Sequence, residues 1–560
     1  MKVRVSRSVI GLGNSCKSFC AKRRLAERRA GVYSALMLYR AFATVGGLTL
    51  VSRALGFVRD ILIAAALGTG GVADAFFVAF RFPNLFRRLF GEGAFNSAFV
   101  PLFAKRLEGE GKAAASRFAE EALSGLTFIL VLFSAVAMVA MPWLMIVLAP
   151  GFISDPAKYG LSVELTRITF PYLLCMSLAA LLSGVLNSLQ RFWAAAAAPI
   201  LLNVVLISAM ALAIGLGYAN TPGAGYILAI GVVIAGVSQL AMLWIAVRRA
   251  GIRLVLRRPR YTDGMRRLVQ LGIPGILSGG ITQINIVVGT VIASLEAGAV
   301  SYLYYADRLY QLPLGIVGIA IGVVLLPDLA RKLRAGEMKA ALDSQNRSLE
   351  FALLLTLPAA VALAIAAEPI ISVLFERGAF KASDTPATAW ALAAFAAGLP
   401  AFVLIKVFQP AYFAREDTRT PMWFAAVNMA VNVVASLVLF FLFKSWGWMP
   451  HVGIAIATAI AGWLNAFMLW WVLARDGRFA PDVRLMGNLP LIVAASVVMG
   501  AVLWLALPVA LDYTVITNPL YVRIASLTGL VVLGMVVFFG IVATTGVFGL
   551  DQLKKMLRRR

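Results

Sequence analysis

Long apolar runs, separated by short polar segments, recur along the whole chain. Each run is about 20 residues long, the length that an α-helix needs to cross about 30 Å of hydrocarbon. The polar–apolar alternation over roughly 10 residues that marks the strands of a membrane β-barrel is not seen. We therefore predict an all-α polytopic membrane protein with about fourteen spanning helices, near residues 42–68, 72–100, 118–148, 162–188, 195–217, 225–247, 268–294, 298–330, 348–366, 386–413, 421–443, 452–473, 486–508 and 520–546.

The composition agrees with this pattern. Of the 560 residues, 61% are hydrophobic and only 14% are charged. Soluble proteins carry roughly 45–50% apolar and about 25% charged residues. A soluble core cannot absorb this much apolar surface, but a bilayer can.

The basic residues are distributed unevenly between the two sides of the predicted membrane. Of the 51 lysine and arginine residues, 38 fall in the N-terminal tail, the C-terminus and the even-numbered connections, and five fall on the opposite side. Positively charged loops stay in the cytoplasm, so both termini are predicted to be cytoplasmic. This distribution accounts for the formal net charge of +25, and no nucleic acid partner is expected.

Two sequence matches indicate an internal duplication. The second span ends with Val100-Pro101-Leu102-Phe103-Ala104-Lys105-Arg106-Leu107, and the eighth ends with Leu326-Pro327-Asp328-Leu329-Ala330-Arg331-Lys332-Leu333, an offset of 226 residues. Asn203-Val204-Val205 matches Asn432-Val433-Val434 at an offset of 229. These matches predict a parallel repeat of six helices, whose two copies can rock against each other around a site near the membrane midplane.

The chain then divides into five segments. We expect a basic tail at 1–36, a six-helix lobe at 37–250, a basic cytoplasmic linker at 251–267, a second six-helix lobe at 268–475, and two extra helices with a basic C-terminus at 476–560. The tail lacks the apolar core of a cleaved signal sequence. We expect that Met37 is the native start or that the tail is disordered.

Eight basic residues lie within the predicted spans or at their edges. They are Arg53, Arg59, Arg81, Arg87, Arg88, Arg167, Arg308 and Lys406. Arg53 and Asp60 are seven residues apart and share one helix face, and so do Asp74, Arg81 and Arg88. A charge at the bilayer centre costs at least about 2.5–3.5 kcal/mol, so these side chains are expected to face a wet cavity or a partner.

Internal ion pairs cannot account for the whole set. Against these eight cations we set four acids of the same spans, Asp60, Asp74, Glu92 and Asp307, which leaves an excess of four cations. A salt bridge that locks two helices together remains an alternative for any single residue. Because a guanidinium group pairs with phosphate oxygens through two hydrogen bonds and stays protonated, the excess predicts a phosphate-bearing anionic substrate.

The sequence gives little support for nucleotide binding, disulfide bonds or a metal site. No Gly-Lys-Ser or Gly-Lys-Thr occurs, so no P-loop is present. The three cysteines, Cys16, Cys20 and Cys175, form neither a disulfide framework nor a metal-binding pattern. We therefore predict a transporter rather than an enzyme, with no metal and no cofactor.

Several motifs closely resemble the MurJ (MviN) family of lipid II flippases, which belongs to the multidrug/oligosaccharidyl-lipid/polysaccharide exporter superfamily. The resemblance covers about residues 37–550. It rests on Ser52-Arg53-Ala54-Leu55-Gly56-Phe57-Val58-Arg59-Asp60, Ala73-Asp74-Ala75-Phe76-Phe77-Val78-Ala79-Phe80, Pro83-Asn84-Leu85-Phe86-Arg87-Arg88, Gly91-Glu92-Gly93-Ala94-Phe95 and Tyr304-Tyr305-Ala306-Asp307-Arg308-Leu309.

This resemblance implies two lobes around a cationic cavity, and a groove on the last two helices for an undecaprenyl tail. It implies that substrate is bound by Arg53, Arg59, Arg87 and Arg308, with Arg88, Asp74 and Ser301 beside them. It implies gating or salt-bridging roles for Asp60, Glu92 and Asp307. The family's glutamate three residues after the span-8 arginine is Gln311 here, which puts any coupling role of that position in doubt.

The expected function is to flip lipid II, an undecaprenyl-pyrophosphate-linked disaccharide-pentapeptide, from the cytoplasmic to the periplasmic leaflet of the bacterial inner membrane. The membrane potential or an ion gradient is the expected driver. The implied partners are lipid II, membrane lipids and other cell-wall synthesis proteins. The alternatives are a flippase for another polyprenyl-linked glycan, a cation-coupled drug antiporter of the same fold, a membrane enzyme acting on polyprenyl phosphates, and a non-transporting scaffold.

Overall fold

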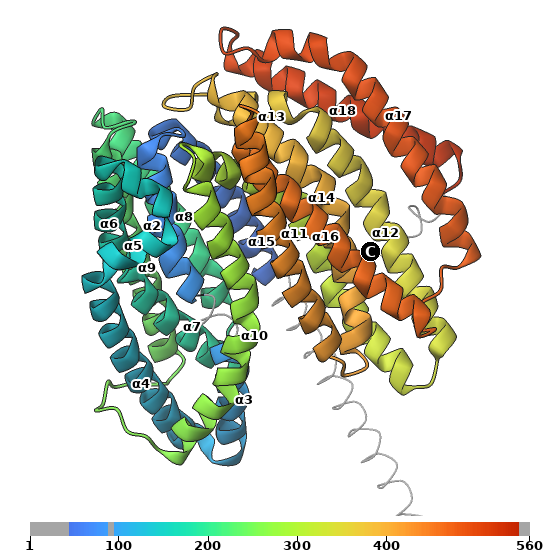
Figure 1. Ribbon diagram of the computed structural model, residues 1–560. Helices are drawn as coiled ribbons and strands as arrows, with labels where there is room; N and C mark the ends of the chain where they lie inside the picture. The colour runs from blue at the N-terminus through green and yellow to red at the C-terminus, as the bar shows by residue number, and fades with distance from the viewer. Residues whose placement is uncertain (1–43, 88–93, 548–560) are drawn as a thin grey trace, which may run out of the picture.

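The structure, a computed structural model, describes residues 44–87 and 94–547, and this part of the chain is helical, with no β-strand (Figure 1). The N-terminal half consists of an unlabelled helix at 44–67, α2 (Gly71–Arg87), α3 (Ala94–Gly109), α4 (Gly111–Val139), α5 (Met141–Leu148), the 3₁₀ turn η2 (Pro150–Ser154), α6 (Pro156–Thr169), α7 (Tyr172–Ser188), α8 (Trp193–Gly215) and α9 (Pro222–Arg249).

The C-terminal half follows an extended linker. It consists of α10 (Asp263–Ala293), α11 (Ala299–Arg334), α12 (Met338–Ile365), α13 (Ala367–Phe375), α14 (Asp384–Phe413), α15 (Arg419–Ser445), α16 (Pro450–Arg475), α17 (Val483–Thr514) and α18 (Leu520–Thr544). The linker docks on α4, where Arg257 forms an ion pair with Glu120 at 2.6 Å.

These helices match the fourteen predicted spans in order, which confirms the predicted fold class. Within the described residues, ten helices are long and apolar enough to cross a membrane by themselves. The four other predicted spans coincide with the helix at 44–67, with α2 and α3 together, with α10 and with α11. These four contribute most of the polar side chains of the site described below.

Some predicted spans are interrupted or extended. Span 4 is divided into α6 and α7 at Pro171, whose ring nitrogen cannot donate to the preceding turn. Span 3 continues as α5 after a break at Ala140, just before Pro142. The helix of span 3 begins at Gly111, because helical hydrogen bonding continues into the polar residues beyond the hydrocarbon.

Two groups of helices face each other in Figure 1 and diverge toward its lower edge. We call residues 44–249 the N-terminal lobe and α11 to α16 the C-terminal lobe; the exact domain boundaries remain a prediction. Helix α10 lies between the lobes, packed against α3 on one side and α15 on the other. Helices α17 and α18 pack against α12 and α13 through a separate apolar cluster that includes Leu354, Met499 and Phe538.

The backbones of the two lobes meet at the end of the predicted spans that lies opposite the basic loops. Backbone groups approach closely there, which small residues permit: Gly68 has a positive φ of 64°, and a Cβ on it would lie 2.5 Å from the carbonyl oxygen of Ala379. Hydrogen bonds across this end include Ala379 N to Ala65 O at 2.8 Å, Tyr305 Oη to Gly68 O at 2.8 Å, and Gly151 N to Ser294 Oγ at 3.1 Å. We call this contact region the closure.

Candidate functional site

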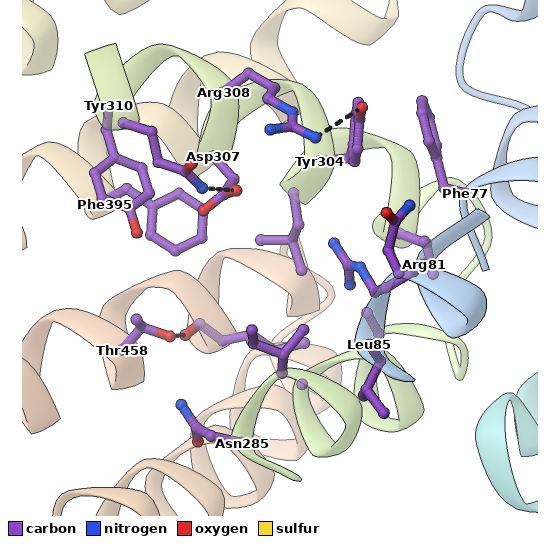
Figure 2. A pocket seen from close by; sticks show the side chains of 18 of the residues that line it. Phe77, Arg81, Leu85, Asn285, Tyr304, Asp307, Arg308, Tyr310, Phe395 and Thr458 are labelled. Carbon is purple, nitrogen blue, oxygen red and sulfur yellow. Dashed lines mark hydrogen bonds between the residues drawn. The ribbon is translucent and has the colours of Figure 1, made fainter. Parts of the chain in front are cut away.

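A cavity of about 510 Å³ lies between the lobes, on the open side of the closure. Its walls come from the helix at 44–67, α2, α8, α10, α11, α14, α15 and α16. Arg59, Arg81 and Arg308 line it, together with Asp307 and Tyr304. Figure 2 shows Arg308 and Arg81 directed into the same space from α11 and α2.

Arg59 is held in place by the N-terminal lobe. Its Nη2 and Nε donate to Oδ1 of Asp60 at 2.7 and 3.0 Å, and its Nη1 donates to Oδ1 of Asn203 at 3.0 Å. The amide of Asn203 in turn donates to the carbonyl of Ser52 at 2.8 Å. Arg59 is 8% exposed, so one neighbouring carboxylate and one amide of α8 fix its orientation at the cavity wall.

Arg308 reaches the same carboxylate from the other lobe. Its Nε lies 3.5 Å from Oδ2 of Asp60, and its Nη2 donates to the hydroxyl of Tyr304 at 3.1 Å. The guanidinium also lies over the Tyr304 ring, 4.8 Å from the centroid, and that ring stacks on Phe77 at 3.8 Å. The Nε of Arg308 is buried against Asp60. The side chain as a whole is still 32% exposed and lines the cavity, so the guanidinium group is accessible to a ligand.

Two further arginines reach helices of the C-terminal half; Arg81 lines the cavity, whereas Arg53 is not among its lining residues. Arg81 donates from Nη1 to the hydroxyl of Thr290, in α10, at 2.5 Å. Arg53 extends from the N-terminal lobe to α11, where its Nη1 would lie 2.6 Å from a Cβ on Gly315. The glycine therefore leaves room for the guanidinium.

Asp74 and Ser301 are in the closure and not in the cavity wall. Asp74 is fully buried. It accepts hydrogen bonds from Lys158 at 2.7 Å, from the backbone N–H of Gly298 at 2.9 Å, and from the N–H and hydroxyl of Ser301 at 3.0 and 2.5 Å. Because these partners occupy both carboxylate oxygens, Asp74 serves here as an N-terminal cap of α11 supplied by the opposite lobe. The resemblance had placed both residues beside the substrate.

Asp307 lines the cavity, and its carboxylate accepts a hydrogen bond from the Gln311 side chain one turn later. Gln311 thus donates to Asp307, whereas a glutamate at the same position would repel that carboxylate. Arg88 and Glu92 lie outside the described residues, as does the side chain of Arg87, so their predicted roles stay predictions.

Reasoning from the sequence missed several residues of this site. Tyr304 and Asn203 orient the two arginines that share Asp60. Asn432 and Thr458 line the C-terminal wall with Asn285. These side chains are neutral, so the excess of positive charge could not identify them, although Asn203 and Asn432 belong to the sequence match that indicates the internal repeat.

Comparisons with known proteins agree with this geometry. The family model of the lipid II flippase MurJ matches residues 63–523. A probable lipid II flippase MurJ from Rhizobium meliloti (strain 1021) is 49% identical over 533 residues, which cover 94% of this chain and 97% of the relative. A probable lipid II flippase MurJ from Rickettsia prowazekii (strain Madrid E) is 32% identical over 521 residues, covering 93% and 100%.

Solved structures show the same fold. A lipid II flippase MurJ in an inward closed conformation superposes with a TM-score of 0.72 at 24% identity, covering 89% of this chain and 97% of that one. An inward-facing multidrug resistance MATE transporter of the MOP superfamily superposes with a TM-score of 0.62 at 14% identity, covering 78% and 98%. From the family match and these relatives, the chain belongs to the lipid II flippase MurJ family of multi-pass membrane transporters.

Proposed function

We propose that this protein flips lipid II from the cytoplasmic to the periplasmic leaflet of the inner membrane by alternating access. One observation carries the proposal: Arg59 and Arg308, from opposite lobes, share the single carboxylate of Asp60 at the cavity. Two guanidinium groups on one carboxylate leave a net positive charge. That charge is costly within a membrane unless an anion joins it.

A diphosphate suits this arrangement. Guanidinium groups bind phosphate oxygens through paired, charge-assisted hydrogen bonds, and the guanidinium group of Arg308 is partly exposed at the cavity. Because the two arginines come from different lobes, a bound diphosphate would hold both lobes at once. Binding would then be coupled to the rocking of the lobes, which alternating access requires.

The proposed topology gives the transport direction. If the basic loops are cytoplasmic, both termini are cytoplasmic and the closure lies at the periplasmic end. The cavity is then loaded from the cytoplasmic side. The undecaprenyl tail would stay in the lipid throughout, along the groove implied for α17 and α18, while the head group crosses between the lobes.

The membrane potential is the proposed driver. It is worth about 2.3 kcal/mol per charge per 100 mV. An inside-negative potential moves an anionic head group outward and draws the empty cationic cavity inward, so both half-cycles are favoured. Transport in vesicles should therefore slow when the potential is collapsed, and an unchanged rate would exclude this driver.

The function is tested in cells depleted of the native protein, by measuring which leaflet holds lipid II. Arg308→Ala should abolish flipping, and Arg308→Lys should reduce it at least about tenfold, because an ammonium group cannot form the paired hydrogen bonds of a guanidinium. Arg331→Ala is the matched control, since Arg331 is on the same helix but its side chain is 74% exposed at an ion pair with Asp328. Normal flipping by Arg308→Ala would refute the proposal.

A further inference from the structure

The cavity has a second polar wall that carries no arginine. Asn432, in α15, donates from Nδ2 to Oδ1 of Asn285, in α10, at 2.8 Å. Thr458, in α16, donates to Oδ1 of Asn432 at 3.4 Å. Gln283 lines the cavity on the same helix as Asn285. Figure 2 shows Asn285 and Thr458 across the cavity from Arg308. We call Gln283, Asn285, Asn432 and Thr458 the amide wall.

The internal repeat relates this wall to the arginine site. The offset of 226 residues that aligns the ends of spans 2 and 8 also aligns Arg59 with Asn285, and the offset of 229 aligns Asn203 with Asn432. In the N-terminal lobe Arg59 donates to Asn203 at 3.0 Å, and in the other half Asn432 donates to Asn285 at 2.8 Å. The equivalent helix pairs of the two halves therefore differ in charge: the N-terminal pair is joined by an arginine–asparagine contact, and the C-terminal pair by a neutral asparagine–asparagine contact.

The amide wall retains unused hydrogen-bonding groups. Asn285 uses its Oδ1 as an acceptor, so its N–H donors remain available toward the cavity. A ligand that accepts hydrogen bonds from these donors would gain affinity, because one such hydrogen bond contributes about 0.5–1.5 kcal/mol.

We infer that the amide wall binds the hydroxyl- and amide-rich sugar–peptide part of the head group, while the arginine site holds the diphosphate. This inference rests on the proposed function. Neutral amides and hydroxyls can both donate to and accept from sugar hydroxyls and peptide groups. A site built in this way discriminates against a ligand that lacks those groups, because its own buried polar atoms would then stay unpaired.

The test compares two ligands, lipid II and undecaprenyl diphosphate, which shares the tail and diphosphate but lacks the sugar–peptide part. Binding of each is measured by native mass spectrometry on the full chain in lipid nanodiscs. Asn285→Ala and Asn432→Ala should each weaken lipid II binding by about fivefold to tenfold, the effect of one lost hydrogen bond. Binding of undecaprenyl diphosphate should not change.

Three further variants make the outcome decisive. Asn465→Ala is the matched control, because Asn465 is a buried amide of α16 outside the cavity lining, and it should leave the ratio of the two affinities unchanged. Thr458→Val preserves the side-chain shape and covers the case in which an asparagine variant does not fold. Like the asparagine variants, it should lower the affinity for lipid II relative to that for undecaprenyl diphosphate. Arg308→Ala should weaken both ligands equally.

The two failures can be told apart. If the amide-wall variants leave the affinity ratio unchanged or weaken both ligands equally, the inference is wrong and the proposed function stands. If Arg308→Ala leaves both affinities unchanged, the diphosphate site of the proposed function is wrong.

Discussion

The carboxylate of Asp74, in α2 of the N-terminal lobe, accepts hydrogen bonds from both the backbone N–H and the hydroxyl of Ser301, in the first turn of α11. A helix normally caps its exposed N–H groups with a residue of its own chain segment. Here the cap comes from the opposite lobe, so the lobes cannot separate at this end without exposing the N-terminus of α11.

Asp74→Asn should weaken the closure. The substitution removes the charged acceptor of the hydrogen bonds from Gly298 and Ser301, and a hydrogen bond to a charged group is worth about 1.5–3 kcal/mol. It also leaves the buried ammonium group of Lys158, which pairs with Asp74 at 2.7 Å within the same lobe, without a counter-ion. The expected result is a shift toward conformations that are open at this end. Spin labels at Ala157 and Ala382, both exposed near the closure, would report longer distances by electron paramagnetic resonance in a cysteine-free background.

A second substitution separates charge from shape. Replacing Lys158 by Met together with Asp74→Asn removes both charges, and it should return part of the population to the short distance. If Asp74→Asn alone leaves the distance distribution unchanged, the cap does not hold the lobes together.

Gly68→Ala should also open the closure. The new Cβ would lie 2.5 Å from the carbonyl oxygen of Ala379, and backbone atoms cannot move aside as a flexible side chain can. Gly217→Ala is the matched control, because Gly217 has a similar positive φ of 76° but nothing within 4 Å of a Cβ. The same spin labels should show longer distances for Gly68→Ala only, and equal effects of the two would point to backbone strain instead.

Asn203→Leu should impair transport without removing any charge. The amide holds Nη1 of Arg59 at 3.0 Å, so its loss lets the guanidinium turn away from the position in which it would meet a diphosphate. We expect flipping to fall several-fold, less than in Arg59→Ala, with expression unchanged. A rate equal to that of the unmodified protein would mean that the orientation of Arg59 is irrelevant.

Tyr304→Phe isolates the hydroxyl from the ring. It removes the 3.1 Å hydrogen bond to Arg308 but keeps the ring beneath the guanidinium and its stacking on Phe77. Lipid II affinity should change by less than about tenfold, in line with one hydrogen bond. Tyr304→Leu removes both contacts and should cost more; equal losses would show that the ring contributes nothing.

The sequence predicted the fold well because membrane spans are specified by local apolar length. For ten of the spans, helix length and apolar composition alone are enough to predict a membrane crossing. The helix at 44–67 is one of the other four spans, and it carries Arg53, Arg59 and Asp60, which lower its mean hydropathy. The breaks near Ala140 and Pro171 depend on individual prolines, which an apolar average does not register.

The site was predicted only in part, because pairing depends on tertiary structure. The excess of cations was visible in the sequence, but the sharing of Asp60 by Arg59 and Arg308 requires two lobes to meet. Lys158 is one of the five basic residues on the side opposite the basic loops, yet its ammonium group is buried against Asp74. Neutral side chains such as Asn285 carry no charge signal, and their place in the cavity could be found only from the coordinates.

Cryo-electron microscopy of the protein in nanodiscs with bound lipid II would test the central claim most directly. The account predicts that the diphosphate lies within hydrogen-bonding distance, about 3 Å, of the guanidinium groups of Arg308 and Arg59. An ordered diphosphate outside the cavity, with both arginines still on Asp60, would contradict it.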